Sequence, residues 1–155
     1  NMSSVQIADS GIPAMSARAI DKVRELTDIV KAAPQYALET NHIIHGGMYS
    51  RTITMPAGHV LTGSLVKVST LLIINGHVTA YLGDAGSAEF NGYGVVPASA
   101  GRKQAFISHT DTDITMVFVT EATSVEEAEA ELTDEADMLV SRSDTGSNIV
   151  LITGE

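Results

Sequence analysis

The sequence contains five histidines, which are candidates for acid/base chemistry or metal binding according to the residues around them. His109 precedes Asp111 and Asp113, and a carboxylate beside a histidine can orient one ring nitrogen and leave the other free to transfer a proton. His109 is therefore a candidate acid or base. The alternative is a loop between two strands that is held by internal hydrogen bonds.

Two further histidines, His42 and His45, form a His-x-x-His pattern, which would place both side chains on one face of a helix. In a strand the two side chains would point to opposite faces, because successive side chains alternate. The pair is a candidate metal site that another histidine would complete. The alternative is solvent exposure or a hydrogen bond to the main chain. His59 and His77 each follow a turn signal, which is typical of surface positions.

Four basic residues are candidates for binding an anionic ligand in the interior: Arg51, Lys67, Arg102 and Lys103. The chain is otherwise acidic, with a formal charge of −10. Local positive charge inside such a protein would attract a small anion, for example a carboxylate or a phosphate-bearing sugar. The alternative is that one or two of the four pair with Glu89 or Asp84 while the others extend to water.

The composition narrows the classes of partner and fold. Nineteen acidic against nine basic residues oppose contact with nucleic-acid phosphates and anionic lipid, so neither partner is expected. Cysteine is absent, which excludes disulfides, thiolate metal sites and a cysteine nucleophile. A chain of 155 residues with 44% hydrophobic content predicts one globular domain. No apolar run has the length needed to span a bilayer.

The elements that would position these residues are mainly strands. Short apolar segments broken by Gly, Pro and Asn-Gly pairs run over residues 49–119 and predict about eight strands in an antiparallel sandwich or barrel. Asn75-Gly76 predicts a hairpin turn within residues 71–82, and Asn91-Gly92 predicts another tight turn. Alternation over residues 50–55 places Arg51 on the inward face, where it must have an anionic or hydrogen-bonding partner.

One helix is predicted before the strands in the sequence and another after them. After an arm over residues 2–13, Ser16 is a good N-cap for a helix over 17–32. Two overlapping capping boxes, which start at Thr123 and Ser124, begin a second helix that reaches about Val140. The organisation is an arm and helix over 1–40, a barrel over 41–121, and a helix with a β-prone tail over 122–155. The tail residues 149–152 are expected to add to a sheet, of this subunit or of another.

An acidic segment accompanies the second helix. Eight of the nineteen acidic residues lie between Glu121 and Asp137. Such a run predicts a solvated face, and the alternative is an acidic surface for a basic partner.

The order of these signals resembles the cupin superfamily of double-stranded β-helix, or jelly-roll, proteins. The residues that carry the resemblance are Pro56-Ala57-Gly58, Gly76 and the Gly-x-x-x-x-Pro from Gly92 to Pro97. The stretches 42–51 and 98–103 resemble small uncharacterised cupin-like proteins of tailed phages and prophages. The resemblance implies a jelly-roll β-barrel with one N-terminal and one C-terminal helix, located in the cytoplasm of a bacterial host cell or associated with a virion.

The resemblance does not extend to a metal site. Metal-binding cupins carry His-x-His and a glutamate in the first block and a further histidine in the second. The corresponding positions here fall near Gly63, Leu65, Ser69 and residues 102–104, none of which is a histidine or a carboxylate. No cofactor is therefore predicted. The alternative is a divalent transition metal held by an atypical set that includes His42 and His45.

Two functions follow as hypotheses. The first is an oligomeric, non-catalytic binding or structural module of phage or prophage type. The second is a cupin-fold isomerase, epimerase or lyase acting on a small anionic or sugar-like ligand. Its base would be His109 or His45, its proton donor Tyr49 or Tyr93, and its clamp Arg51 with Arg102. An enzyme predicts that histidine and arginine side chains converge on one pocket, whereas a module predicts a barrel mouth filled by Met, Leu and Phe.

Overall fold

The computed structural model describes residues 11–155, so most of the predicted N-terminal arm lies outside the described residues. The strands are β1 Glu39–His45, β2 Met48–Met55, β3 Val60–Thr62, β4 Thr70–Tyr81, β5 Ser87–Ala98, β6 Ala105–Ser108, β7 Thr112–Val119 and β8 Ser147–Ile152. The helices are α2 Ala17–Lys31 and α3 Val125–Leu132, with 3-10 turns η1 Gly83–Ala85, η2 Ala136–Met138 and η3 Val140–Arg142. None of these helices is long and apolar enough to cross a membrane.

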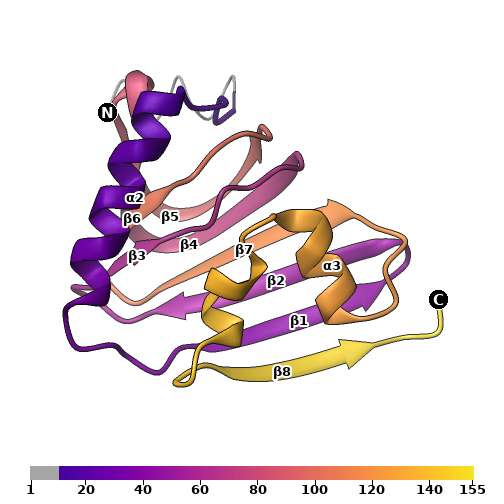
Figure 1. Ribbon diagram of the computed structural model, residues 1–155. Helices are drawn as coiled ribbons and strands as arrows, with labels where there is room; N and C mark the ends of the chain where they lie inside the picture. Colours follow the sequence, from indigo (N-terminus) through magenta and orange to yellow (C-terminus); the bar gives the residue numbers. More distant parts are fainter. Residues whose placement is uncertain (1–10) are drawn as a thin grey trace.

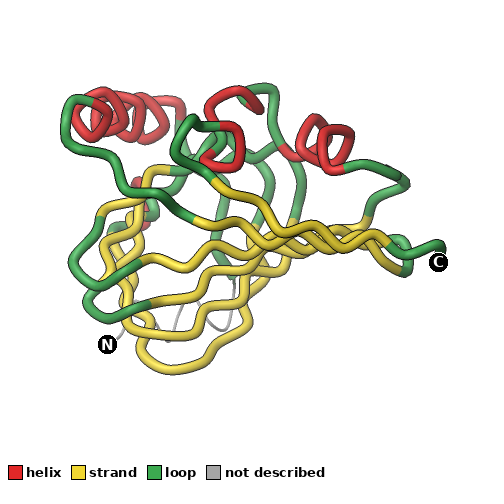
Figure 2. Tube along the Cα trace, turned by 90° about the horizontal axis from the view of Figure 1, so that it is seen from below, coloured by secondary structure: helices red, strands yellow, loops and turns green. Residues whose placement is uncertain are grey.

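The strands form one curled sheet. Their order is β3-β6-β4-β7-β2-β1-β8, and β5 pairs with the other side of β4. The helices lie along one side of the molecule (Figures 1 and 2). α3 and the turns after it cover the inner face of the sheet, whereas α2 packs against Ala105 and Tyr81 on the opposite face of β6 and β4. The predicted fold class, mainly β with one helix before the strands and one after most of them, is confirmed.

The N-terminal helix forms nearly as predicted. The hydroxyl of Ser16 accepts a hydrogen bond from the main-chain N–H of Ala19, and α2 ends one residue before the predicted boundary. Its buried residues Ala19 and Val23 pack with Met15 and Ala105. The helix therefore rests on its own sheet.

The predicted hairpin turn at Asn75-Gly76 is wrong. β4 runs straight through these residues and pairs along its whole length with β5, and Asn91-Gly92 likewise lies inside β5. Gly76 has φ of +146°, and a Cβ there would lie 2.7 Å from the Cα of Thr112. At this point the neighbour of β4 changes from β7 to β6. The glycine therefore serves a close approach of the backbone rather than a turn.

The second predicted helix is too long. α3 ends at Leu132, where Thr133 has an extended conformation, and the chain continues in η2 and η3 instead. The carbonyl of Leu132 accepts a hydrogen bond of 2.9 Å from the main-chain N–H of Lys67. The carbonyls of the last helical turn have no partner within the helix. The hydrogen bond from Lys67, in the loop before β4, supplies a partner for one of them.

The β-prone tail adds to the sheet as predicted, and it does so within its own chain. β8 pairs parallel with β1, from Glu39 opposite Ser147 to Ile44 opposite Ile152. The sheet thus ends at β8, whose six residues are all exposed.

Candidate functional site

A cavity of about 80 Å³ lies between the inner face of the curled sheet and the segment that covers it. Leu72, Phe106, Ile114 and Met116 line it from the strands, and residues 138–140 line it from the covering segment. The polar residues of its wall are Arg51, Thr62, Ser64, Arg102 and Gln104. The barrel interior thus combines an apolar lining with two guanidinium groups.

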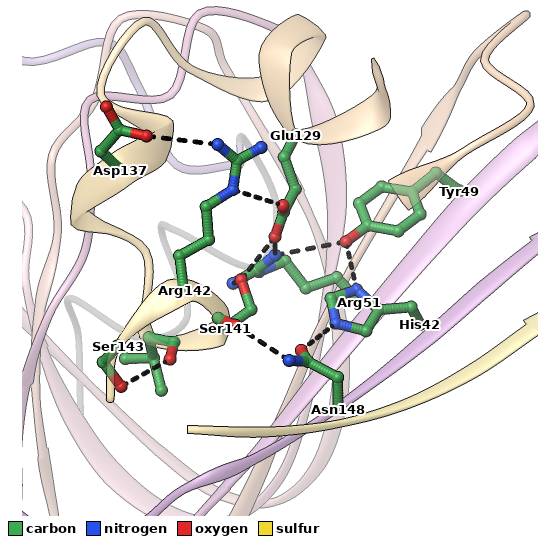
Figure 3. A network of polar contacts seen from close by, with 10 residues as sticks. His42, Tyr49, Arg51, Glu129, Asp137, Ser141, Arg142, Ser143 and Asn148 are labelled. Atoms are coloured by element: carbon green, nitrogen blue, oxygen red, sulfur yellow. Dashed lines mark hydrogen bonds and ion pairs between the residues drawn. The ribbon is translucent and has the colours of Figure 1, made fainter. Parts of the chain in front are cut away.

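The first guanidinium, that of Arg51, has a carboxylate partner. Its Nη1 lies 2.9 Å from Oε2 of Glu129 on α3, and both side chains are 2% exposed. Its Nη2 donates to the hydroxyl of Ser141, which in turn donates to the same carboxylate (Figure 3). The sequence-based expectation that an inward Arg51 must have a partner is confirmed, and the positive charge is neutralised where it is buried.

Glu129 is the residue of this site that sequence reasoning missed. It stands inside the acidic segment that was predicted to be a solvated face. A signal was present, because Glu129 follows Val125 by four residues and precedes Leu132 by three, which places it on the apolar side of the helix. Burial would raise the pKa of Glu129, but hydrogen bonds from Ser141, Arg51 and Arg142 together lower it, so the carboxylate is ionised.

His42 extends the network from Glu129 to the last strand. Nδ1 of His42 lies 2.7 Å from the hydroxyl of Tyr49, and Nε2 lies 2.6 Å from Oδ1 of Asn148. The amide nitrogen of Asn148 donates to the carbonyl of Ser141, which fixes Oδ1 as the acceptor for His42 (Figure 3). Nε2 of His42 therefore carries the proton and Nδ1 accepts from Tyr49. Burial lowers the pKa of His42, in agreement with a neutral ring.

The second guanidinium, that of Arg102, has only neutral partners among the described residues. It donates to Oε1 of Gln104 at 3.0 Å, to the carbonyl of Ser99 at 2.6 Å and to the hydroxyl of Thr70 at 2.7 Å. Its remaining contact is with the sulfur of Met116 at 3.7 Å, a weak acceptor. The side chain is 1% exposed, and burial lowers its pKa to about 10.

The other two predicted ligand-binding cations do not line the cavity. Lys103 is buried, and its Nζ lies 3.1 Å from a carboxylate oxygen of Glu135. Lys67 is half-exposed and pairs with Asp134 at 2.6 Å. Both carboxylates belong to the acidic segment, which therefore supplies internal counter-ions as well as surface charge.

The candidate acid/base and metal residues are dispersed. His42 is buried in β1 while His45 is exposed on the opposite face of the same strand, so the two do not converge on one ion. His109 lies 2.7 Å from the hydroxyl of Thr79 and packs against His77, which pairs with Glu89. Tyr93 is 72% exposed on β5. None of these residues is among those that line the cavity, and residues 11–155 contain no cluster of three or more metal-ligating side chains.

The outer edge of β8 is a second feature with open binding capacity. The N–H groups of Ser147 and Thr153 donate to carbonyls on the β1 side. Because main-chain groups alternate along a strand, those of Asn148, Val150 and Ile152 point away from β1, toward the open edge. Residues 149–152 are between 45% and 56% exposed, so both faces of this apolar strand are accessible.

Comparisons with known proteins bear on the fold. No family model and no curated protein matches the sequence. A solved cupin superfamily protein from Desulfitobacterium hafniense has 10% identity, with 57% of this chain and 83% of that chain covered and a TM-score of 0.46. A cupin-2 domain protein from Rhodospirillum rubrum has 14% identity, coverage of 60% and 66%, and a TM-score of 0.48. The likeness is one of fold. A protein of unknown function from Vibrio parahaemolyticus has 10% identity, coverage of 49% and 81%, and a TM-score of 0.42.

Proposed function

We propose that this protein is a non-catalytic, cupin-like module that assembles into a homo-oligomer by joining the sheets of two copies at β8. The observation that carries the proposal is the outer edge of this strand, whose main-chain groups have no pairing strand among residues 11–155 and lie between apolar side chains. Such an edge is a template for another strand, and proteins that stay monomeric protect it with lysine, proline, a bulge or a covering segment. Residues 147–153 contain neither a charged residue nor a proline.

A second copy of β8 fits this edge. In an antiparallel arrangement, hydrogen-bonded residues lie directly opposite each other, so Val150 of one copy faces Val150 of the other and Asn148 faces Ile152. The same register places Ile149 opposite Leu151 on the outer face. Every apolar residue of the edge except Ile152 then gains an apolar neighbour under two-fold symmetry. Although the chain carries a charge of −10, the paired segment brings no like charges together.

A catalytic role has less support. The cavity lacks the histidines that the isomerase, epimerase or lyase hypothesis needs, and its covering segment contributes Met138 and Leu139. This is the apolar filling expected for a module. The resemblance to small cupin-like proteins of tailed phages and prophages favours a place in a phage or prophage assembly, in the bacterial host cell or in the virion.

Sedimentation velocity across a wide range of protein concentration tests the proposal. The unmodified protein is expected to form a dimer. Val150→Pro removes an N–H that faces the open edge and none that bonds to β1, a position where a strand tolerates proline, so this variant is expected to be monomeric. The matched control Val150→Thr keeps both the N–H and the β-branched shape and should dimerise.

Two results would overturn the proposal. One is a monomer for the unmodified protein at every concentration. The other is a Val150→Pro variant that is folded by circular dichroism and still dimerises as the unmodified protein does, because the interface would then lie elsewhere.

A further inference from the structure

We infer that the interior cavity is a binding site for a short-chain carboxylate, held by Arg102 and Gln104. Neither residue contributes to the edge of β8, so the inference is independent of the proposed assembly.

Arg102 is a buried cation without a carboxylate partner among the described residues. A buried cation is costly unless a counter-ion accompanies it. Arg51 has Glu129 and Lys103 has Glu135, whereas the partners of Arg102 in residues 11–155 are an amide, a carbonyl, a hydroxyl and a thioether. Arg102 is also the most completely buried of these three cations. An anion in the cavity would supply the charge that residues 11–155 do not place beside Arg102.

Two hydrogen-bond donors beside the cavity are incompletely used by the described residues. Oε1 of Gln104 accepts a hydrogen bond from Nε of Arg102, and this contact determines which end of the side-chain amide is the oxygen. Nε2 of Gln104 is then a buried donor without a partner among the described residues. One N–H of Arg102 faces only the sulfur of Met116. Gln104, Arg102 and Met116 all line the cavity, so two under-used donors border the same space.

The size and lining of the cavity suit a small carboxylate with a short hydrocarbon chain. A cavity needs about 10–15 Å³ to hold one water molecule, so about 80 Å³ has room for an anion of a few heavy atoms. Two donors from neighbouring planar groups suit the two oxygens of a carboxylate. Most of the remaining wall, including Leu72, Phe106 and Ile114, is apolar and suits a hydrocarbon chain. Acetate, propionate and butyrate meet these conditions, whereas a phosphate-bearing sugar exceeds the space.

Isothermal titration calorimetry with sodium propionate provides the direct test. The expected result is saturable binding, with a melting temperature that rises with propionate concentration. Sodium chloride at equal ionic strength and neutral propionamide, which has the same shape, should produce neither effect. Binding of propionamide as strong as that of propionate would overturn the role of charge, and no saturable propionate binding would overturn the site.

Gln104→Glu tests the two residues specifically. The substitution keeps the oxygen that accepts from Arg102 and replaces the unpartnered donor with a carboxylate oxygen. The variant is expected to melt at a higher temperature without ligand and to bind propionate at least about tenfold more weakly, because the new carboxylate occupies the position of the ligand charge. Lys67→Gln removes a surface cation outside the cavity and should bind propionate normally.

A measurement on the unmodified protein keeps the test decisive if Gln104→Glu does not fold. In protein whose methionine methyl groups are labelled with carbon-13, the NMR signal of the Met116 methyl group should shift saturably as propionate is added. The same methyl group should show a nuclear Overhauser effect to the methyl group of propionate. A Met116 signal that propionate leaves unchanged would contradict the inference. Unaltered propionate affinity in a folded Gln104→Glu variant would contradict it as well.

Discussion

His42 and Glu129, two buried ionisable side chains of the interior network, are each held in one protonation state by named partners. His42 is neutral between Tyr49 and Asn148, and Glu129 is ionised between Ser141 and two arginines. Their pKa values are displaced downward, the first mainly by burial and the second, against the effect of burial, by hydrogen bonds. Acid must therefore weaken the network at two successive stages.

The first stage belongs to His42. The pKa of His42 in the folded protein lies below its ordinary value of 6.5, so the unfolded chain binds a proton first as the pH falls. The stability that the neutral ring contributes is complete above pH 6.5 and is lost as the pH falls through the folded pKa. The free energy of unfolding from urea titrations should therefore decrease between pH 7.5 and pH 5.5.

Two variants identify the group responsible for that decrease. His42→Gln keeps a donor and an acceptor but does not titrate, so its free energy of unfolding should change less over the same interval. His45→Gln, on the exposed face of the same strand, should retain the full decrease. Equal slopes for the two variants would assign the effect to another group. Below about pH 4.5 the lowered pKa values of Glu129 and Glu135 add a further loss.

Single residues differ in how far the sequence alone could place them. Alternation along β2 was enough to predict that Arg51 points inward. Its partner could not be predicted, because Glu129 lies 78 positions away on a helix whose docking depends on the finished sheet. The neutral surroundings of Arg102 were equally hidden, since they come from residues on separate segments, among them Thr70 and Met116.

Among the elements, the long pair β4 and β5 shows how a turn signal can be overridden. Gly76 and Gly92 lie opposite each other in the register, and both have positive φ. Asn-Gly is a local preference, whereas the exchange of β7 for β6 beside β4 depends on strands that come later in the chain. Helix starts were predictable from Ser16 and Ser124 because a cap is a local interaction.

Gly76→Ala should destabilise the protein by about 2–4 kcal/mol, from the strained backbone and the contact of the new Cβ with Thr112. Gly94→Ala is the matched control within β5, because nothing lies within 4 Å of its Cβ position. Its free energy of unfolding should change by about 1 kcal/mol or less. Urea denaturation of both variants measures the difference, and a Gly76→Ala variant as stable as the control would refute the close-approach argument.

At the scale of the whole molecule, the two proposed binding features lie on different parts of the curled sheet. The cavity lies on the inner face, where residues 138–140 cover it. The edge at β8 lies on the border of the sheet (Figure 1). The predicted fold class followed from the density of strand and turn signals. The order of the strands did not, because β1 and β8 are far apart in the sequence and no local pattern joins them.

Assembly at the edge predicts that stability depends on concentration. A dimer that forms only from folded copies raises the melting temperature as the protein concentration increases. The unmodified protein and Val150→Thr should show this rise in calorimetric scans, whereas Val150→Pro should melt at one temperature throughout. A melting temperature of the unmodified protein that does not depend on concentration would argue against the dimer.

The pairing of β8 with β1 also sets an order of events in folding. The contact of His42 with Asn148 closes a loop of 106 positions, and long loops are closed late because their closure costs the most chain entropy. Until β8 arrives, β1 is the border of the sheet and Nε2 of His42 lacks its acceptor. On this argument the last strand to join both completes the interior network and forms the edge at which the proposed dimer would pair, so we expect association to follow folding.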